Sequence, residues 1–396
     1  MKTRNYLLSC LFTFGCSALS AQEQALADTT QQTTTLYEMW KKEEARPFTS
    51  HMNIQFCTSF TSQFQDFAVE EATFKLNRLR MEILGRFLGK FGYRFRYTYN
   101  KYTNPNTVDN LSTHIELANM DWDVSKLLTL KAGKEHFLLG GYEYYVTGIL
   151  VRQFSDFNNN TQSYLTGITG TFHLTPRHDL SLQVANNRVE TESQINTGEG
   201  QASIPKVPLM GTVNWQGRFL DDGALQFYYG AAAGQILRNR NIYYLTFGNV
   251  WERGPVLAYL DCMYSREEVD SKGLITAIRT VGEDEETLTA QYVQYLSWIG
   301  NVDYRLHPKW NLFVKGVYEW GGVYKTNTVY ERGKYRNTWN VQACLEYYPL
   351  KRKDLQLFLH VSYKKYLFTE QAEALGEKDF SEQQIMLGLL YTIPVF

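Results

Sequence analysis

Cysteine and proline are scarce in this chain of 396 residues, which contains five cysteines and nine prolines. Cys10 and Cys16 lie near the N-terminus, while Cys57, Cys262 and Cys344 are far apart in the rest of the chain. Three isolated cysteines cannot build a disulfide framework, and their spacing is not that of a zinc site. We therefore expect a fold without disulfides or a structural metal.

Long hydrophobic runs are also missing. Beyond residue 21 no stretch of 18 consecutive apolar residues occurs, although 44% of the chain is hydrophobic. Because a transmembrane helix needs about 20 mainly apolar residues, a helical membrane protein is excluded.

The chain has no large excess of charge of either sign. It carries 40 basic and 41 acidic residues, and loss of residues 1–21 would remove Lys2 and Arg4 and leave 38 − 41 = −3. Polyanion-binding proteins are usually strongly basic, so we expect no nucleic-acid partner.

Motifs for catalysis are absent as well. The sequence has no Gly-x-Ser-x-Gly elbow, no His-Glu-x-x-His and no phosphate-binding glycine loop. An outer-membrane lipase would need paired Ser, His and Asn, but nothing in the sequence pairs His173 or His360 with such residues. A TonB-dependent transporter needs a plug domain before its barrel, and residues 22–47 are far too short to form one. This class of protein is therefore not expected either. We predict no enzyme, no cofactor and no metal site.

The N-terminus has the pattern of an export signal. Residues 1–5 are cationic, residues 6–18 are mainly apolar, and small residues precede a cleavage site after Ala21. Lipidation at Cys16 is the alternative, but the leucine expected three residues earlier is missing. Residues 22–47 form a polar segment in which 36–45 predict a short helix. We interpret this segment as a periplasmic tail, or alternatively as a plug or subunit contact.

Aromatic residues are abundant at 15% of the chain, with 28 tyrosines and 23 phenylalanines, and they alternate with polar residues. Residues 91–100 place Phe91, Tyr93 and Phe95 on one face of a strand and Arg94 and Arg96 on the other. This period of two indicates β-strands. It recurs in 51–60, 310–320 and 355–363.

Weaker alternation predicts thirteen more strands. These are 72–86, 111–124, 126–137, 144–155, 162–174, 179–187, 207–219, 223–235, 240–251, 255–265, 288–304, 334–348 and 383–396. Bacterial outer-membrane barrels have even strand numbers and a lipid-facing apolar band between aromatic girdles. We therefore predict an all-β fold, a transmembrane antiparallel β-barrel over 48–396 with sixteen strands, and fourteen or eighteen as alternatives. The apolar last strand, which ends at Phe396, should close it.

Connections of two kinds separate the predicted strands. Tight turns are expected at 175–178, 221–223 and 306–309, and longer outer loops at 100–110, 187–206, 265–287 and 366–382. The acidic run 283–286 is compatible with calcium binding or lipopolysaccharide bridging, but a solvated loop is the simpler reading.

Functional residues of a wide barrel should face its lumen. If Leu79, Met81 and Ile83 face lipid, Arg78, Arg80 and Glu82 face inward, as do Arg94 and Arg96 on the following strand. These four arginines, with Lys131 and Lys134, are the predicted pore-lining and anion-binding residues. Guanidinium groups bind phosphate and carboxylate by charge-assisted hydrogen bonds. The alternative is a mixed-charge lining without selectivity.

Two segments carry a family resemblance. One is FKLNRLRMEILGR at 74–86, and the other is LANMDW at 117–122 followed by LTLKAGKEHF at 128–137. Both resemble the phosphate-selective porins O and P in the form common among Bacteroides-like bacteria, over about residues 50–155. The resemblance implies a sixteen-stranded, trimeric anion channel with an inward loop after the second segment.

Two features depart from the family pattern. No proline follows Lys134-Glu135-His136-Phe137, and 137–147 read FLLGGYEYYVT, which is aromatic and not rich in lysine. Anion preference is thus expected, with phosphate among the candidate solutes, and these two departures leave phosphate specificity open. The tyrosines of this stretch suggest either a sugar-stacking constriction or an interfacial girdle.

Together these patterns predict a bacterial outer-membrane porin that passes small hydrophilic, preferably anionic solutes by diffusion. The expected partners are outer-membrane lipid, lipopolysaccharide and two further copies of the chain in a homotrimer. The alternatives are a non-conducting barrel that docks or assembles a surface complex, and a secreted all-β binding protein.

Overall fold

The computed structural model describes residues 48–100, 114–187, 195–196, 205–278, 288–327, 329–350 and 354–396. The predicted signal at 1–21, the polar segment 22–47 and the acidic run 283–286 lie outside these residues.

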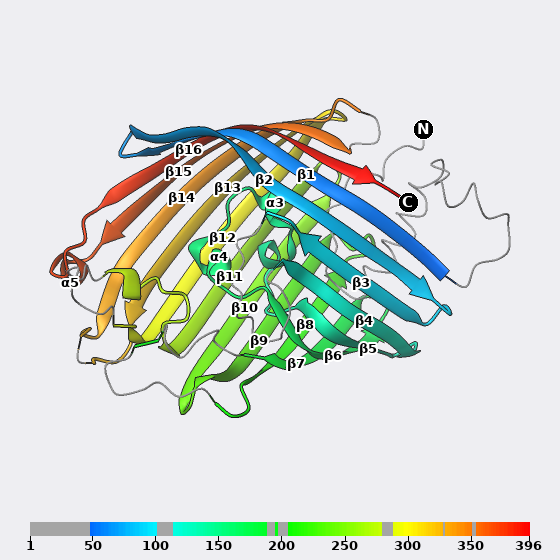
Figure 1. Cartoon of the computed structure of the whole chain (residues 1–396), viewed down its shortest axis with the longest axis horizontal. Helices are drawn as coiled ribbons and strands as arrows, with labels where there is room; N and C mark the ends of the chain where they lie inside the picture. Colours follow the sequence, from blue (N-terminus) through cyan, green and yellow to red (C-terminus); the bar gives the residue numbers. More distant parts are fainter. Residues whose placement is uncertain are drawn as a thin grey trace.

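Sixteen antiparallel strands form a closed barrel in which every strand pairs with its sequence neighbours (Figure 1). The strands are β1 Phe48–Gln65, β2 Ala68–Phe87, β3 Phe91–Thr98, β4 Ile115–Ser125, β5 Leu128–His136, β6 Tyr164–Thr175, β7 His178–Asn186, β8 Leu209–Phe219, β9 Leu225–Leu237, β10 Arg240–Arg253, β11 Val256–Val269, β12 Gln291–His307, β13 Trp310–Val323, β14 Gly333–Tyr347, β15 Leu355–Phe368 and β16 Phe380–Pro394. The predicted fold class and the count of sixteen are confirmed.

Short helices lie between some strands. They are η1 Glu143–Tyr145, α3 Gly148–Val151, α4 Asp156–Asn159, η3 Thr276–Ile278 and α5 Glu370–Glu373. Among the described residues, no helix is long and apolar enough to cross a membrane.

Alternation sorts each strand into two faces. On β15, Phe358 and His360 are buried toward the lumen, whereas Leu357, Leu359 and Val361 are exposed on the outer face. An apolar outer face is stable in lipid, and closure leaves no strand edge without hydrogen-bond partners. The same pattern along β9 to β16 gives a continuous apolar outer wall.

Strands β1 and β16 close the barrel. They pair without a register shift from Asn53 and Pro394 at one end to Gln65 and Glu382 at the other. A further backbone hydrogen bond of 2.7 Å runs from the Val395 N–H to the Met52 carbonyl. The predicted role of the last strand is confirmed.

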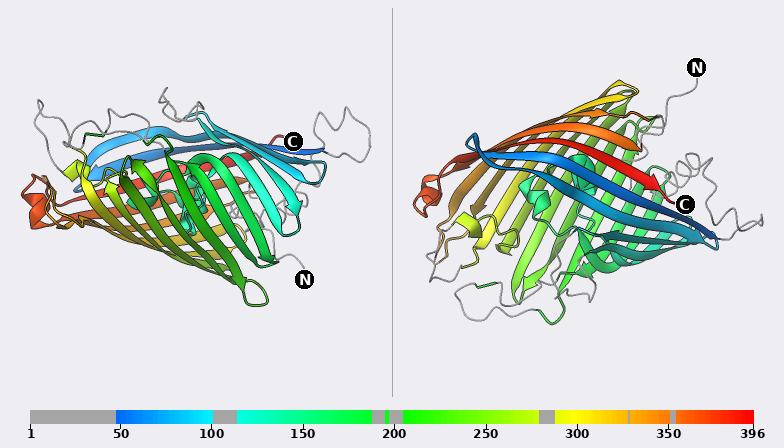
Figure 2. Two further views of the ribbon diagram at one scale, coloured as in Figure 1. Left: turned by 90° about the horizontal axis from the view of Figure 1, so that it is seen from below. Right: turned by 45° about the horizontal axis from the view of Figure 1, so that its top comes forward.

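The three predicted tight turns join β6 to β7, β8 to β9 and β12 to β13. They lie at the end of the barrel that carries the C-terminus, while α5 lies at the opposite end, where the strands joined by the longer connections end (Figures 1 and 2). In outer-membrane barrels the short turns are periplasmic and the long loops extracellular. We name the two ends accordingly.

One predicted strand is wrong. Residues 144–155 form the end of η1, α3 and an irregular stretch, and belong to the connection between β5 and β6. The residues from Leu139 to Val146 are buried on successive positions and not on alternate ones. A segment buried on all sides has no lipid-facing row. Its apolar residues were therefore mistaken for one face of a strand. Its removal reduces the seventeen candidates to sixteen.

The wall of the barrel is uneven in length. Strands β3 to β5 have 8 to 11 residues, whereas β10 to β16 have 14 to 17. Because β5 ends early, the chain leaves the wall inside the barrel and residues 137–163 run within the lumen (Figures 1 and 2).

Candidate pore and its constriction loop

Residues 137–163, here called the constriction loop, leave β5 at His136 and return to β6 at Tyr164. In between they contact β9 to β15 on the opposite wall as well as β2 on the near side. The sequence pattern suggested an inward loop only through the family resemblance. The residues that fix it are described below.

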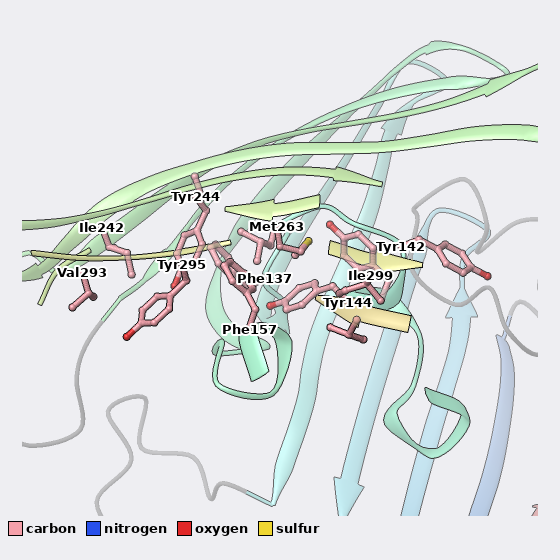
Figure 3. Close-up of a cluster of buried hydrophobic side chains, with 14 of the residues drawn as sticks. Phe137, Tyr142, Tyr144, Phe157, Ile242, Tyr244, Met263, Val293, Tyr295 and Ile299 are labelled. Atoms are coloured by element: carbon pink, nitrogen blue, oxygen red, sulfur yellow. The ribbon is translucent and has the colours of Figure 1, made fainter. Parts of the chain in front are cut away.

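An aromatic core joins the first half of the constriction loop to the wall. Phe137, Leu139 and Tyr142 are buried with Tyr244 and Met263, which face inward from β10 and β11 (Figure 3). This burial removes a large apolar area from water, which stabilises the loop in one position.

Two glycines allow the loop backbone to touch the wall. Gly140 and Gly141 have φ values of 99° and 78°, which favour glycine. A Cβ on Gly140 would lie 2.8 Å from the backbone nitrogen of Gly230 on β9. At this point the Gly141 N–H donates to the Tyr228 carbonyl at 3.0 Å.

A buried carboxylate on β11 receives the next turn of the loop. Asp261 Oδ2 accepts from the N–H groups of Tyr142 at 2.8 Å and Glu143 at 2.7 Å. The Glu143 side chain in turn accepts from Lys315 Nζ at 2.9 Å and from the Tyr259 hydroxyl at 3.1 Å. Glu143 and Asp261 are fully buried, so these bonds are needed to offset the cost of their desolvation.

The middle of the loop is held by Arg152, whose φ of 65° turns the chain after α3. Its guanidinium donates to Glu346 at 3.0 Å and Gln356 at 2.7 Å. It also lies 3.7 Å from the ring centre of Phe358, a cation–π contact. This arginine is therefore a structural anchor and not a free cation in the lumen.

Helix α4 is held by charges of both signs. The N–H groups of Asp156 and Phe157 donate to the Glu319 carboxylate at 2.8 and 2.9 Å. Arg336 and Lys364 both bind the Asp156 carboxylate. Burial alone would raise the pKa of Asp156, but these two cations lower it below its usual value.

The predicted arginines lie on β2 and β3, on the near side of the loop, but they are not a purely basic patch. Glu82 binds Arg94 at 2.6 Å and Arg96 at 2.8 Å. Glu116 on β4 binds Arg80 at 2.9 Å and Arg78 at 3.3 Å. We call these six residues the arginine cluster; four cations and two anions give it a net charge of +2.

The four arginines differ in exposure. The side chains of Arg80 and Arg96 are only 3% and 4% exposed, against 12% for Arg94 and 23% for Arg78. Arg80 also donates to the Thr147 hydroxyl of the constriction loop at 3.0 Å. Arg78 and Arg94 are thus the members that a solute can approach most easily.

Glu116 was not identified from the sequence. The pairing of β3 with β4 shifts between Arg96 and Tyr97, which skips Glu116 and interrupts the alternation. A β-bulge of this kind turns a side chain to an unexpected face. Its position between Leu117 and Ile115 gave no signal for an inward carboxylate.

The two predicted lysines lie on β5. Lys131 interacts electrostatically with the carboxylates of Asp121 and Glu135 on the inner face. Lys134 is half-buried and is paired with Ala118 of β4 and Thr166 of β6. Both are separate from the arginine cluster, and their role in anion binding stays a prediction.

A second loop, residues 270–278, covers part of the constriction loop from the extracellular side. The buried Lys272 binds Glu267 and lies 4.5 Å from the ring centre of Phe157 in α4. Asp270 accepts from the Tyr295 hydroxyl at 2.6 Å and from the Thr276 N–H at 2.8 Å. The sequence had placed this stretch in an outer loop, so the inward contact was missed.

The tyrosines of 137–147 serve neither function suggested by the sequence. Tyr142, Tyr144 and Tyr145 are 3%, 4% and 5% exposed inside the barrel. An interfacial girdle faces lipid on the outside, so that reading is wrong. A sugar platform needs an open ring face, and these rings are covered. Their role is to pack the loop. No group of three or more His, Cys, Asp or Glu able to hold a metal occurs in the part of the chain that the structure describes.

Residues 51–393 match the family model of the phosphate-selective porins O and P. The chain belongs to this family. The match covers almost the whole barrel, well beyond the two segments that first suggested it. This porin is accordingly an outer-membrane protein with a passive channel function. Comparison with curated protein sequences finds no match.

Solved structures share the fold of this porin at low sequence identity. The outer-membrane channel DcaP of Acinetobacter baumannii has a TM-score of 0.59 and 11% identity, with 89% of this chain and 99% of that chain covered. An anion-selective porin from Comamonas acidovorans has a TM-score of 0.54 and 8% identity, covering 87% and 100%. The trimer form of OmpT from Vibrio cholerae has a TM-score of 0.50 and 10% identity, covering 87% and 99%.

Proposed function

We propose that this porin passes small hydrophilic anions by diffusion along the side of the lumen lined by β2 to β7, where the arginine cluster lies. The observation that carries the proposal is the excess of two positive charges in that cluster, beside a constriction loop whose own charges are paired with the opposite wall. A cationic constriction attracts anions and repels cations.

The carboxylates of the cluster support this function and do not cancel it. Glu82 bridges Arg94 and Arg96, and Glu116 bridges Arg78 and Arg80, which offsets the repulsion between the guanidinium groups and fixes their orientation. Arg78 and Arg94 then present forked donors to a passing phosphate or carboxylate. Weak, shared binding of this kind allows an ion to enter and to leave.

General anion preference fits this cluster better than phosphate specificity. The constriction loop itself is aromatic, and its cation Arg152 is bound by Glu346 and Gln356. We expect phosphate to pass as one of several anions. We assign Lys131, on the inner face of β5, a supporting role, and we expect no catalysis.

We further propose that residues 1–21 direct export, that residues 22–47 form a periplasmic segment, and that the protein is a homotrimer surrounded by lipid and lipopolysaccharide. The trimer form of OmpT, which shares the fold, supports the oligomeric state. The exposed apolar outer wall supports the lipid environment.

The test is single-channel recording of the detergent-extracted protein in a planar bilayer under a KCl gradient. The wild type should give a reversal potential shifted toward the equilibrium potential of chloride. A trimer should close in three steps. The double variant Arg78→Gln plus Arg94→Gln should move the reversal potential toward zero, because the cluster then loses its net positive charge. Arg253→Gln is the matched control, since Arg253 ends β10 at the periplasmic rim, where its exposed side chain pairs with Asp222.

Unchanged selectivity in the double variant would show that the filter lies elsewhere. A folded barrel without any conductance would favour the alternative, in which the barrel is a docking or assembly component of a surface complex.

A further inference from the structure

A row of polar and basic residues crosses four strands on the outer face, at the extracellular end. Arg266 of β11 pairs with Gln294 of β12, Gln294 with Gly322 of β13, and Gly322 with Lys334 of β14. Directly paired residues lie on the same face of a sheet. Because adjacent strands are about 4.8 Å apart, the two cations are separated by roughly 14 Å along this row.

Aromatic rings pack against Arg266 and against two further cations at this end of the barrel, Lys325 and Arg240. The Arg266 guanidinium lies 4.0 Å from the ring centre of Tyr324, and Lys325 Nζ lies 4.5 Å from that of Tyr292. The rings of Tyr292 and Tyr324 are themselves 5.8 Å apart. The Arg240 guanidinium lies 5.1 Å from the ring centre of Tyr292 and donates to its hydroxyl. Three cations thus surround one pair of tyrosines.

A depression lies beside this group. It has a volume of about 420 Å³ and is lined by Gln294, Trp320, Val323, Arg332, Gly333 and Lys334. Lys334 Nζ donates to the Tyr318 hydroxyl at 3.2 Å and lies 5.8 Å from the ring centre of Trp320. We call Arg240, Arg266, Lys325, Arg332 and Lys334, with this depression, the outer basic row.

Opposite charge is sparse around three cations of the outer basic row, Arg266, Lys325 and Lys334. Within the described ranges, no carboxylate lies within ion-pair distance of Arg266, Lys325 or Lys334. The adjacent Glu267 is buried on the inner face and bound by Lys272, and Glu268 accepts from the Asn241 N–H at 2.6 Å. At the periplasmic end of the same wall, by contrast, Arg253 is paired with Asp222. The row is therefore a site of concentrated positive charge.

The position of the row identifies the layer that it contacts. It lies just beyond Trp320, an outward aromatic near the extracellular end of β13, and the paired Tyr318 and Trp339 lie closer to the middle of β13 and β14. Aromatic belts mark the boundary between hydrocarbon and headgroups. Cations placed immediately outside such a belt lie at headgroup height, where they attract anionic lipids.

We propose that the outer basic row binds the phosphorylated headgroup of an outer-leaflet glycolipid. The inference rests on the proposed outer-membrane function and adds a specific site to it. Phosphate oxygens accept from Arg266 and Lys334, while the apolar side of the depression, formed by Trp320, contacts the sugar or the start of an acyl chain. A solute in transit does not reach this face, because the row lies outside the barrel.

The test is native mass spectrometry of the purified full-length porin with added lipid A, with lipid A lacking its phosphates, and with inorganic phosphate. We expect the wild type to retain phosphorylated lipid A through delipidation. The triple variant Arg266→Gln, Lys325→Gln and Lys334→Gln should bind it more weakly by roughly tenfold or more, because each cation near a lipid surface contributes to binding. Arg253→Gln should bind as the wild type does.

Three results would overturn the proposal. These are equal retention by the triple variant, equal binding of dephosphorylated lipid A, and displacement of the lipid by millimolar inorganic phosphate, which would indicate a site for the free anion. Conductance of the triple variant in a phosphatidylcholine bilayer, free of lipid A, should equal that of the wild type. Failure of the channel function would therefore appear in a different measurement from failure of the lipid site.

Discussion

At the scale of single residues, this porin uses several of its inward charges to hold its own loop. Lys315, Arg152, Arg336 and Lys364 all bind carboxylates within the barrel, and Asp261 binds backbone N–H groups. A buried charge without a partner costs several kcal/mol. Charges that appear available for a solute in the sequence are therefore occupied in the structure, and the arginine cluster stands out because its cations outnumber its anions.

Acidification should release helix α4 from the wall. The pKa of Asp156 is lowered in the folded state, so its ion pairs contribute stability that is present above its unfolded pKa of about 3.9 and is lost as pH falls through the folded value. We expect channel current noise to rise as the pH falls below that unfolded value. Asp156→Asn should show that noise already at pH 7 and lose roughly 3 kcal/mol of unfolding free energy.

The matched control is Glu370→Gln in the exposed helix α5, which should keep the wild-type pH profile. Noise that is independent of pH in both proteins would contradict the anchoring role of Asp156.

At the scale of elements, the short strand β5 and the constriction loop act together. Because β5 ends within the barrel, the loop starts inside the lumen and does not need to fold back over the rim. The two glycines then bring its backbone against β9, and the tyrosines pack over the contact. The loop is part of the hydrophobic core and not a surface connection.

Replacement of Gly140 by valine should displace the loop from the wall. The new Cβ would lie 2.8 Å from the Gly230 nitrogen, and φ at this position is 99°. We expect a loss of about 1–3 kcal/mol and a less regular conductance. The loss of stability is measured by heating samples to increasing temperatures and finding, by electrophoresis, the temperature at which the folded band disappears. The conductance is measured by planar-bilayer recording.

Gly316→Ala on β13 is the control, because a Cβ there meets no atom within 4 Å. Wild-type behaviour of Gly140→Val would show that the close approach of loop and wall is not required.

At the scale of the whole molecule, the outer surface is organised by depth in the membrane. An apolar band covers the middle of the strands, aromatic residues lie near both ends, and the outer basic row lies at the extracellular rim. This order matches hydrocarbon, interface and headgroup layers. The order of residue types on the outer surface is therefore explained by contact with lipid and not by the lumen.

A charge introduced on the outer wall should therefore destabilise the folded barrel more, the deeper it lies in the membrane. Val314→Arg, in the middle of β13, is expected to destabilise the folded barrel in lipid by roughly 2–4 kcal/mol, and Trp310→Arg near the periplasmic end by roughly 1 kcal/mol or less. Equilibrium unfolding in lipid vesicles measures both. Equal costs at the two depths would contradict the assigned membrane position of β13.

The sequence by itself determined the strands, their number and the barrel. Alternation is a local pattern with a period of two, and residues such as those of 91–98 reveal which face meets lipid without any knowledge of their partners. The inward position of Arg78, Arg80, Arg94 and Arg96 followed from the same rule. One strand was added wrongly where a buried loop had strand-like composition.

Only the tertiary structure decided what those arginines bind and how the lumen is divided. Glu116 lies 38 residues from Arg78, Lys315 lies 172 residues from Glu143, and Lys364 lies 208 residues from Asp156. Such partners meet only when the barrel closes and the constriction loop crosses it. The physical reason is that strand formation depends on neighbouring residues, whereas charge pairing and loop packing depend on which walls face each other.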